Sequence, residues 1–310
     1  MLLAGEVVHI TWLQSVLLGL LQGVTEFLPV SSTAHMDIAP QLFGMRDPGA
    51  AFSAVVQLGP IVAIIAYFRQ DLARYASGFL RTINPGNLKP NDVDARLGWF
   101  TVLGTIPLCI FGLLFEKKIG TTFRSLNLVA AMLILLAIVL LVAEKVGSRR
   151  KPLERMTFPD SQVIGWAQVL ALIPGTSRSG LTITAGLFRG LDRESAARFS
   201  FLLSIPAITL AGVYKLVKVL HQTHLGHEAG PYVLAAIVAG VFAYVVVRWF
   251  MGYMKEHNTG IFIAYRILLG IFVLVSVHQG WIHTPPKEEP AAKSPVTAAS
   301  ARVVRPAHNG

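Results

Sequence analysis

Charged side chains are scarce in this sequence. Asp, Glu, Lys and Arg make up 14% of its 310 residues, whereas soluble domains carry about 25%. The mean hydropathy is +0.57, so the chain has too few charges to cover a water-facing surface. This deficit argues against a soluble globular protein and predicts a membrane protein.

Acidic and thiol side chains are also few. There are 17 acidic residues against 27 Lys and Arg, which gives a formal net charge of +10. The basic residues lie mostly in short stretches between apolar runs rather than on one face of a domain, so we expect no nucleic-acid partner. The single cysteine, Cys109, excludes an intramolecular disulfide and is interpreted as a small core hydrophobe.

Long apolar runs dominate what remains. Six of them are each about as long as a helix that crosses a ~30 Å hydrocarbon core. A lipid-exposed backbone must satisfy its own hydrogen bonds, so these runs predict helices and an all-α polytopic membrane protein. The runs are Phe52–Phe68, Phe100–Phe115, Leu126–Ala143, Phe199–Val219, Tyr232–Phe250 and Ile261–Val277.

Two further apolar stretches are interrupted. His9–Leu42 is broken by the polar, proline-containing segment Phe27–Thr33, and Val163–Leu187 is broken by Pro174–Gly180. The flanking pieces are too short to cross a bilayer, so each stretch predicts a re-entrant helix hairpin.

The two halves of the chain resemble each other. Phe52-Ser53, Leu58-Gly59 and Tyr67 recur at constant spacing as Phe199-Ser200, Ile205-Pro206 and Tyr214, and the tip Pro29–Ser32 parallels Pro174–Ser177 with a small shift. Weak symmetry with paired broken helices is typical of inverted-repeat membrane folds. We therefore expect two inverted repeats, each a re-entrant helix hairpin plus three transmembrane helices. The predicted organisation is one membrane domain over residues 1–284, with repeats at about 9–144 and 163–282, followed by a disordered polar tail at 285–310.

Loop charge predicts the orientation. Most of the loop Lys and Arg residues lie in the segments Arg69–Arg96 and Lys145–Arg155 and in a third group of Arg189, Arg193, Arg198 and Lys255. The positive-inside rule puts them in the cytoplasm. In a bacterial plasma (inner) membrane, the first hairpin would then enter from the periplasmic or outer side and the second from the cytoplasm. The two tips would meet near the midplane, at a site open to the outer side.

The tips carry the candidate chemistry. Ionisable residues at membrane depth are costly and point to function, and hydroxyls with an arginine at two helix starts suit a phosphate group. His35 follows Ser31 and Ser32 by one helical turn, so hydroxyl and imidazole can converge. The candidate catalytic residues are His35, Glu26, Ser32 and Arg178, and the candidate substrate-binding residues are Gln22, Ser31, Thr33, Thr176, Ser177, Ser179 and Thr182.

Each of these residues also has a structural explanation. Glu26 would serve as an interfacial carboxylate, His35 as a satisfied interfacial histidine and Arg178 as a snorkelling positive-inside residue. The hydroxyl residues would pack helices, as such residues often do in membranes. The functional interpretation depends on their joint placement at the two tips.

The two tip sequences match a known pattern. Gln22–His35, read QGVTEFLPVSSTAH, and Pro174–Thr182, read PGTSRSGLT, resemble the two signatures of the undecaprenyl-diphosphate phosphatase (bacitracin-resistance) family. The resemblance extends over roughly His9 to Val277. Gln22 fits a position where the family has Glu or Gln, but it cannot act as a carboxylate. Asp37 stands where an apolar residue is expected, and nothing in the sequence explains it.

The resemblance implies hydrolysis of undecaprenyl diphosphate, a lipid diphosphate, to undecaprenyl phosphate and phosphate, which recycles the carrier for cell-wall synthesis. Arg178 would clamp the diphosphate, and Glu26 would ligate a divalent cation, Mg²⁺ or Ca²⁺, together with phosphate oxygens, or accept a proton. His35 or Ser32 would attack phosphorus, or His35 would activate water or Ser32. Sequence leaves this choice open, and it also leaves open a homo-oligomer.

Two other functions compete. Inverted repeats with a midplane anion site are also used by transporters, so a lipid-phosphate transporter or flippase is the main alternative. A transporter needs no nucleophile, which favours hydrolysis. A non-catalytic lipid-binding scaffold would leave the grouping of Glu26, His35 and Arg178 unexplained.

Overall fold

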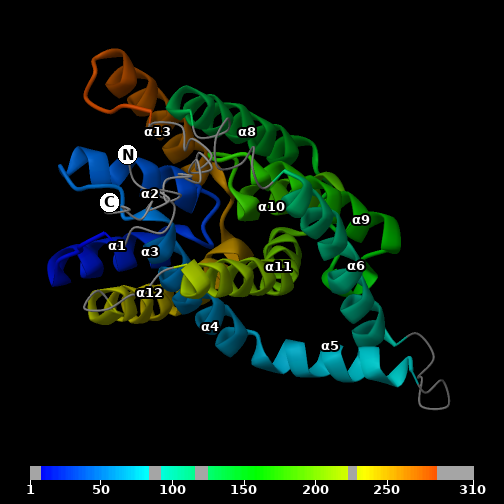
Figure 1. Cartoon of the computed structure of the whole chain (residues 1–310). Helices are drawn as coiled ribbons and strands as arrows, with labels where there is room; N and C mark the ends of the chain where they lie inside the picture. Colours follow the sequence, from blue (N-terminus) through cyan, green and yellow to red (C-terminus); the bar gives the residue numbers. More distant parts are fainter. Residues whose placement is uncertain (1–7, 84–91, 116–124, 223–228, 285–310) are drawn as a thin grey trace, which may run out of the picture.

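The computed structural model describes residues 8–83, 92–115, 125–222 and 229–284, apart from the side chains of residues 218–220 and 222. The expected tail at 285–310 lies outside these ranges. The described residues form helices joined by turns (Figure 1). The α-helices are α1 Trp12–Thr25, α2 Ser32–Leu42, α3 Gly49–Val56, α4 Leu58–Tyr67, α5 Arg69–Arg81, α6 Val93–Leu114, α8 Leu126–Val146, α9 Phe158–Ala167, α10 Arg178–Phe188, α11 Arg193–Gln222, α12 Ala229–Glu256 and α13 Gly260–His278, and the short 3₁₀ helices are η3 Leu153–Arg155 and η4 Gln168–Leu172.

Six helical segments of the described residues are long and apolar enough to cross a membrane. They are α3 together with α4, then α6, α8, α11, α12 and α13, and each coincides with one of the six apolar runs. The structure therefore confirms an all-α, multi-spanning membrane protein. An additional helix, α5, follows the first span and extends from the main body of the molecule toward the start of α6 (Figure 1).

The two interrupted stretches form paired short helices. The first is α1 followed by α2, and the second is α9 with η4 followed by α10. At each tip a serine with positive φ starts the second helix: Ser31 has φ 73° and Ser177 has φ 67°. The Ser31 hydroxyl accepts a hydrogen bond from the Ala34 N–H, and the Ser177 hydroxyl accepts one from the Gly180 N–H. A positive φ costs a non-glycine residue about 1–3 kcal/mol, so two such serines mark tips that the surrounding structure holds in place.

The tip geometry aligns the two tips one residue differently from the sequence comparison. Sequence comparison paired Ser32 with Ser177, but the helix-capping serines are Ser31 and Ser177. Because the cap fixes where each helix begins, Ser32 and Arg178 occupy equivalent first positions of α2 and α10. The two tips therefore present different side chains, a hydroxyl and a guanidinium, from the same helical position.

Small residues dock the first helix of each hairpin. A Cβ added at Gly19 or Gly23 would lie 2.5 Å from the carbonyl oxygen of Ala235 or Ala239, and a Cβ at Gly165 would lie 2.5 Å from that of Gly104. Thus α1 packs directly on α12, while α9 packs directly on α6. Such close backbone contact is how small residues associate membrane helices, and here it fixes the position of both tips.

Candidate functional site

Glu26 lies at the centre of a polar cluster at the end of α1. Its Oε2 accepts hydrogen bonds from the Gln22 amide at 3.0 Å and from the Ser32 hydroxyl at 2.7 Å. Its Oε1 accepts one from the Gln57 amide at 3.1 Å and one from the Arg178 guanidinium at 3.1 Å. A carboxylate that accepts from four donors fixes the groups around it.

The ion pair between Glu26 and Arg178 connects the two hairpins. The side chains of Arg178 and Glu26 are 15% and 9% exposed, so both charges are largely removed from water. The Nε of Arg178 is buried and has no hydrogen-bond partner. This guanidinium therefore keeps donor capacity beyond its bond to Glu26, which an anion at the tips can use.

His35 lies beside this cluster and contacts neither Ser32 nor Glu26 by the hydrogen bonds observed. Its Nδ1 is 2.7 Å from the Ser31 carbonyl oxygen, and its Nε2 is 2.6 Å from the Tyr265 hydroxyl. The predicted convergence of the Ser31 or Ser32 hydroxyl with the imidazole is therefore wrong, because the hydroxyl bonded to His35 is that of Tyr265. The Ser32 hydroxyl instead donates to Glu26.

The other hydroxyl residues hold the tips together. Ser31 bonds Thr33 at 3.1 Å, and Ser177 bonds Ser179 at 3.2 Å. Across the tips, Thr33 accepts from the Gly175 N–H at 3.5 Å and Ser179 donates to the Leu28 carbonyl at 2.9 Å.

Two predicted substrate-binding residues are engaged in local bonds. Thr176 donates to the Ile173 carbonyl at 2.7 Å, and Thr182 donates to the carbonyl of Arg178 at 2.9 Å and bonds Ser200. Both threonines are 1% exposed. Each hydroxyl donates to a carbonyl oxygen three or four residues earlier in the chain. The two hydroxyls therefore stabilise the second hairpin rather than face an open site.

Arg266 of α13 is a further residue of the site. It is fully buried and donates to the carbonyl oxygens of Pro29 at 3.4 Å, Gly175 at 3.3 Å and Thr176 at 2.9 Å. One guanidinium therefore binds the backbone of both tips. Sequence reasoning passed over Arg266 and Tyr265, although an arginine inside the apolar run Ile261–Val277 is a signal by itself. It interprets Gln57 as an interfacial or packing residue.

The expected cation site was tested against these donors. Among the described residues, no group of three or more His, Cys, Asp or Glu side chains is arranged to hold a metal ion. Glu26 offers one carboxylate, and the amides of Gln22 and Gln57 offer oxygens only if they rotate. A Mg²⁺-like ion at Glu26 would have to displace one of the four donors of the carboxylate and take its other ligands from phosphate oxygens and water.

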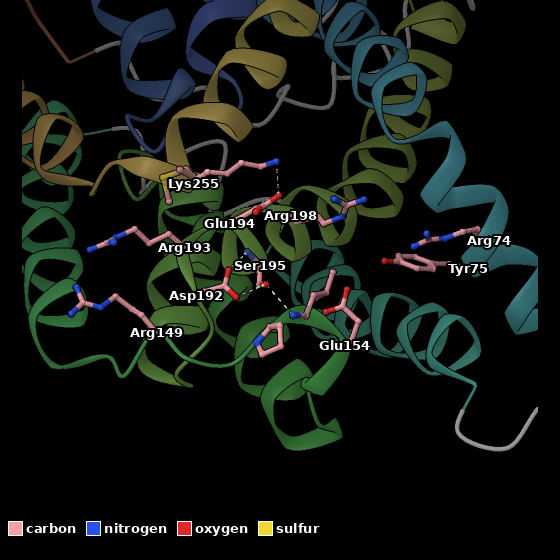
Figure 2. A pocket seen from close by; sticks show the side chains of 13 residues that line it. Arg74, Tyr75, Arg149, Glu154, Asp192, Arg193, Glu194, Ser195, Arg198 and Lys255 are labelled. Atoms are coloured by element: carbon pink, nitrogen blue, oxygen red, sulfur yellow. Dashed lines mark hydrogen bonds and ion pairs between the residues drawn. The ribbon is translucent and has the colours of Figure 1, made fainter.

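A separate cavity of about 640 Å³ lies away from the tips (Figure 2). No predicted site residue lines it. It gathers basic residues from all three groups that loop charge assigns to the cytoplasm, and several of these residues pair with carboxylates, as Arg198 does with Asp71 at 2.6 Å. Its charged lining residues are Arg74, Arg149, Arg193, Arg198, Lys255, Glu154, Asp192 and Glu194.

Comparison with known proteins identifies the relatives of the chain. Residues 15–272 match the family of the bacitracin resistance protein BacA. The chain belongs to this family. It is 47% identical over 277 residues to the undecaprenyl-diphosphatase of Chloroherpeton thalassium, covering 86% of this chain and 97% of the relative.

Two further relatives of this chain are also named undecaprenyl-diphosphatase. The undecaprenyl-diphosphatase of Chlorobaculum parvum is 46% identical over 275 residues, covering 86% of this chain and 97% of the relative. That of Myxococcus xanthus is 46% identical over 273 residues, covering 86% of this chain and 90% of the relative. The matched region includes both hairpins and α13 up to residue 272, so every residue of the polar cluster lies inside it.

Proposed function

We propose that this protein hydrolyses undecaprenyl diphosphate to undecaprenyl phosphate and phosphate in the bacterial plasma membrane. The observation that carries the proposal is the Ser32–Glu26–Arg178 cluster, which joins a hydroxyl, a carboxylate and a guanidinium at the meeting point of two hairpin tips. Its membership of the BacA family and the names of its relatives support the same reaction.

The diphosphate binds where α2 and α10 begin. Arg178 donates to the phosphate oxygens through the guanidinium face that Glu26 does not occupy. The N-termini of the two helices add unpaired N–H groups and a favourable dipole for an anion. Gln22, Thr33 and the capping serines keep these groups in position by the bonds described above.

We infer that Ser32 is the nucleophile, because its hydroxyl donates to a carboxylate that can accept its proton. The Ser32 oxygen attacks the terminal phosphorus, the bond from that phosphorus to the bridging oxygen breaks, and undecaprenyl phosphate leaves. The hydroxyl proton passes to Glu26, to which it is already hydrogen-bonded at 2.7 Å. Water then attacks the phosphorus of the phosphoserine, with His35 accepting the proton of the water. The bond from phosphorus to the Ser32 oxygen breaks, Glu26 returns its proton to that oxygen, and phosphate is released. Phosphoryl transfer depends mainly on positioning and charge neutralisation, and Arg178 supplies the charge.

A divalent cation, Mg²⁺ or Ca²⁺, belongs to this proposal. When bound beside Glu26, it would neutralise charge on the phosphate oxygens. Gln22, Gln57 and Ser32 hold the Glu26 carboxylate in place for this task.

We further infer that the two hairpins belong to inverted repeats and enter the membrane from opposite sides. The support is the matching geometry of the two tips and the gathering of loop arginines around the cavity in Figure 2. With that cavity on the cytoplasmic side, the first hairpin opens to the periplasmic or outer side.

The test is phosphate release from undecaprenyl diphosphate by purified protein in detergent, with and without Mg²⁺ or Ca²⁺. Arg178→Ala, Glu26→Gln and Ser32→Ala should each lower kcat/KM by about 10²-fold or more. The matched control is Ser77→Ala, which removes a hydroxyl from the exposed face of α5 and should leave the rate unchanged.

Two results would count against the proposal. A folded wild-type protein that releases no phosphate from any prenyl diphosphate is no hydrolase. Lipid transport then becomes the leading function, since an assay in detergent has no gradient and would not detect transport. Full activity of Ser32→Ala together with loss of activity in His35→Ala would transfer the nucleophile to His35.

A further inference from the structure

The two nitrogen atoms of His35 are bonded to different kinds of group. Nδ1 faces the Ser31 carbonyl oxygen at 2.7 Å, and Nε2 faces the Tyr265 hydroxyl at 2.6 Å. The two rings are almost parallel, with an angle of 3° and centroids 5.7 Å apart. Tyr265 lies on α13, 230 residues further along the chain, so this contact is a product of the fold.

The carbonyl partner determines the tautomer. A carbonyl oxygen can only accept, so Nδ1 must carry the hydrogen. In the neutral imidazole the lone pair then lies on Nε2, and the Tyr265 hydroxyl is the group that donates to it. The two bonds together fix both the orientation of the ring and the nitrogen that remains basic.

We propose that Tyr265 is a positioning residue for His35, which keeps the lone pair on Nε2 and directed away from Ser31. Tyr265 is 43% exposed, and its hydroxyl occupies the one lone pair of Nε2. In the second step of the proposed reaction, the water therefore passes its proton to the Tyr265 oxygen while the Tyr265 hydroxyl passes its own proton to Nε2. Only this kinetic consequence rests on the proposed function.

Arg266 strengthens the contact between α13 and the tips. It follows Tyr265 directly and binds carbonyl oxygens of both tips, so α13 is held against the hairpins just where Tyr265 meets His35. The tyrosine hydroxyl therefore needs no movement of the helix to reach Nε2.

The first test is spectroscopic and needs no substrate. Protein carrying ¹⁵N-labelled histidine is compared as wild type and Tyr265→Phe in detergent, and the His35 signals among the 9 histidines are assigned with His35→Gln. The Nδ1–H signal should remain, while the Nε2 signal should move toward that of a nitrogen without a hydrogen bond. An unchanged Nε2 signal would overturn the proposal.

The second test is kinetic. Tyr265→Phe keeps the ring but loses the hydroxyl. It should lower kcat about 10-fold or more, a smaller effect than the roughly 10²-fold lower limit for loss of an acid–base group itself. KM should change less than about twofold. The matched control is Tyr253→Phe, because Tyr253 stacks on His257 with centroids 4.5 Å apart but lies at the far end of α12. It should leave kcat and the His35 signals unchanged.

The outcomes separate this inference from the proposed function. A shifted Nε2 signal with wild-type kcat in Tyr265→Phe would refute the positioning role. A wild-type protein without phosphatase activity would refute the proposed function, yet the spectrum would still report whether Tyr265 donates to His35.

Discussion

Replacing Arg266 with Met should uncouple the two hairpin tips. The guanidinium is fully buried and donates to Pro29 in the first tip and to Gly175 and Thr176 in the second. It also donates to the carbonyls of Leu133 and Met132 on α8. A methionine fills similar space but donates nothing.

The expected cost follows from the carbonyls left behind. A buried acceptor that loses its donor costs about 1–3 kcal/mol. The three tip carbonyls lose hydrogen bonds of 2.9 to 3.4 Å. Two of these bonds are long, so the cost of losing each of them lies near the lower end of that range. Removing a buried charge returns part of the cost, so we expect a net loss of about 3 kcal/mol. At roughly 2–4 °C per kcal/mol, Tm should fall by about 6–12 °C.

The assay is thermal unfolding in detergent, combined with phosphate release at a temperature where the variant is folded. The control is Arg248→Met, since Arg248 is exposed on α12 and should change neither quantity. Arg266→Lys should lie between the two, because an ammonium has three donors where a guanidinium has five. An Arg266→Met protein with wild-type Tm and wild-type kcat would refute the reasoning.

Three further perturbations test other parts of the structure. Glu26→Asp should lower kcat by about 10-fold or more in the phosphate-release assay, because the shortened carboxylate cannot keep all four donors in place; an unchanged kcat would argue against Glu26 as the organising group. Burial would by itself raise the pKa of Asp160, but its hydrogen bonds to Lys151, the Thr157 backbone and Arg189 lower it to about 2. Its stabilising effect is therefore complete at neutral pH and is lost as the pH falls from about 5 toward 2, so Asp160→Asn should lower Tm by several degrees at pH 7 and by about half as much near pH 3, when unfolding is followed at both values. Gly23→Leu should separate α1 from α12, because a Cβ there already meets backbone at 2.5 Å; a correctly folded, active variant in size-exclusion chromatography and phosphate release would contradict the packing argument.

Much of the fold follows directly from the sequence. Six apolar runs predict the six spans because a lipid-exposed backbone leaves helices as the solution for such runs. The broken stretches predict the hairpins for the same reason. The start of each tip helix was harder to place, since neighbouring serines at Ser31 and Ser32 both suit a cap, and only the backbone geometry shows that Ser31 is the cap.

The residues of the site likewise fall into those that the sequence predicts and those that it does not. Glu26, Ser32, His35 and Arg178 were predictable because short motifs place them at two adjoining tips, and the tips carry polar groups into an apolar region.

The residues that sequence reasoning missed reach the site from elsewhere in the chain. Gln57 contacts Glu26 across 31 positions, and Tyr265 contacts His35 across 230. No local pattern encodes such pairs, because they exist only once α3 and α13 have packed against the hairpins. Arg266 is different: a single arginine within an apolar run must find acceptors or it would not be buried. Five backbone carbonyls meet that need. The chemistry of this residue requires buried acceptors, but its sequence position does not say which ones.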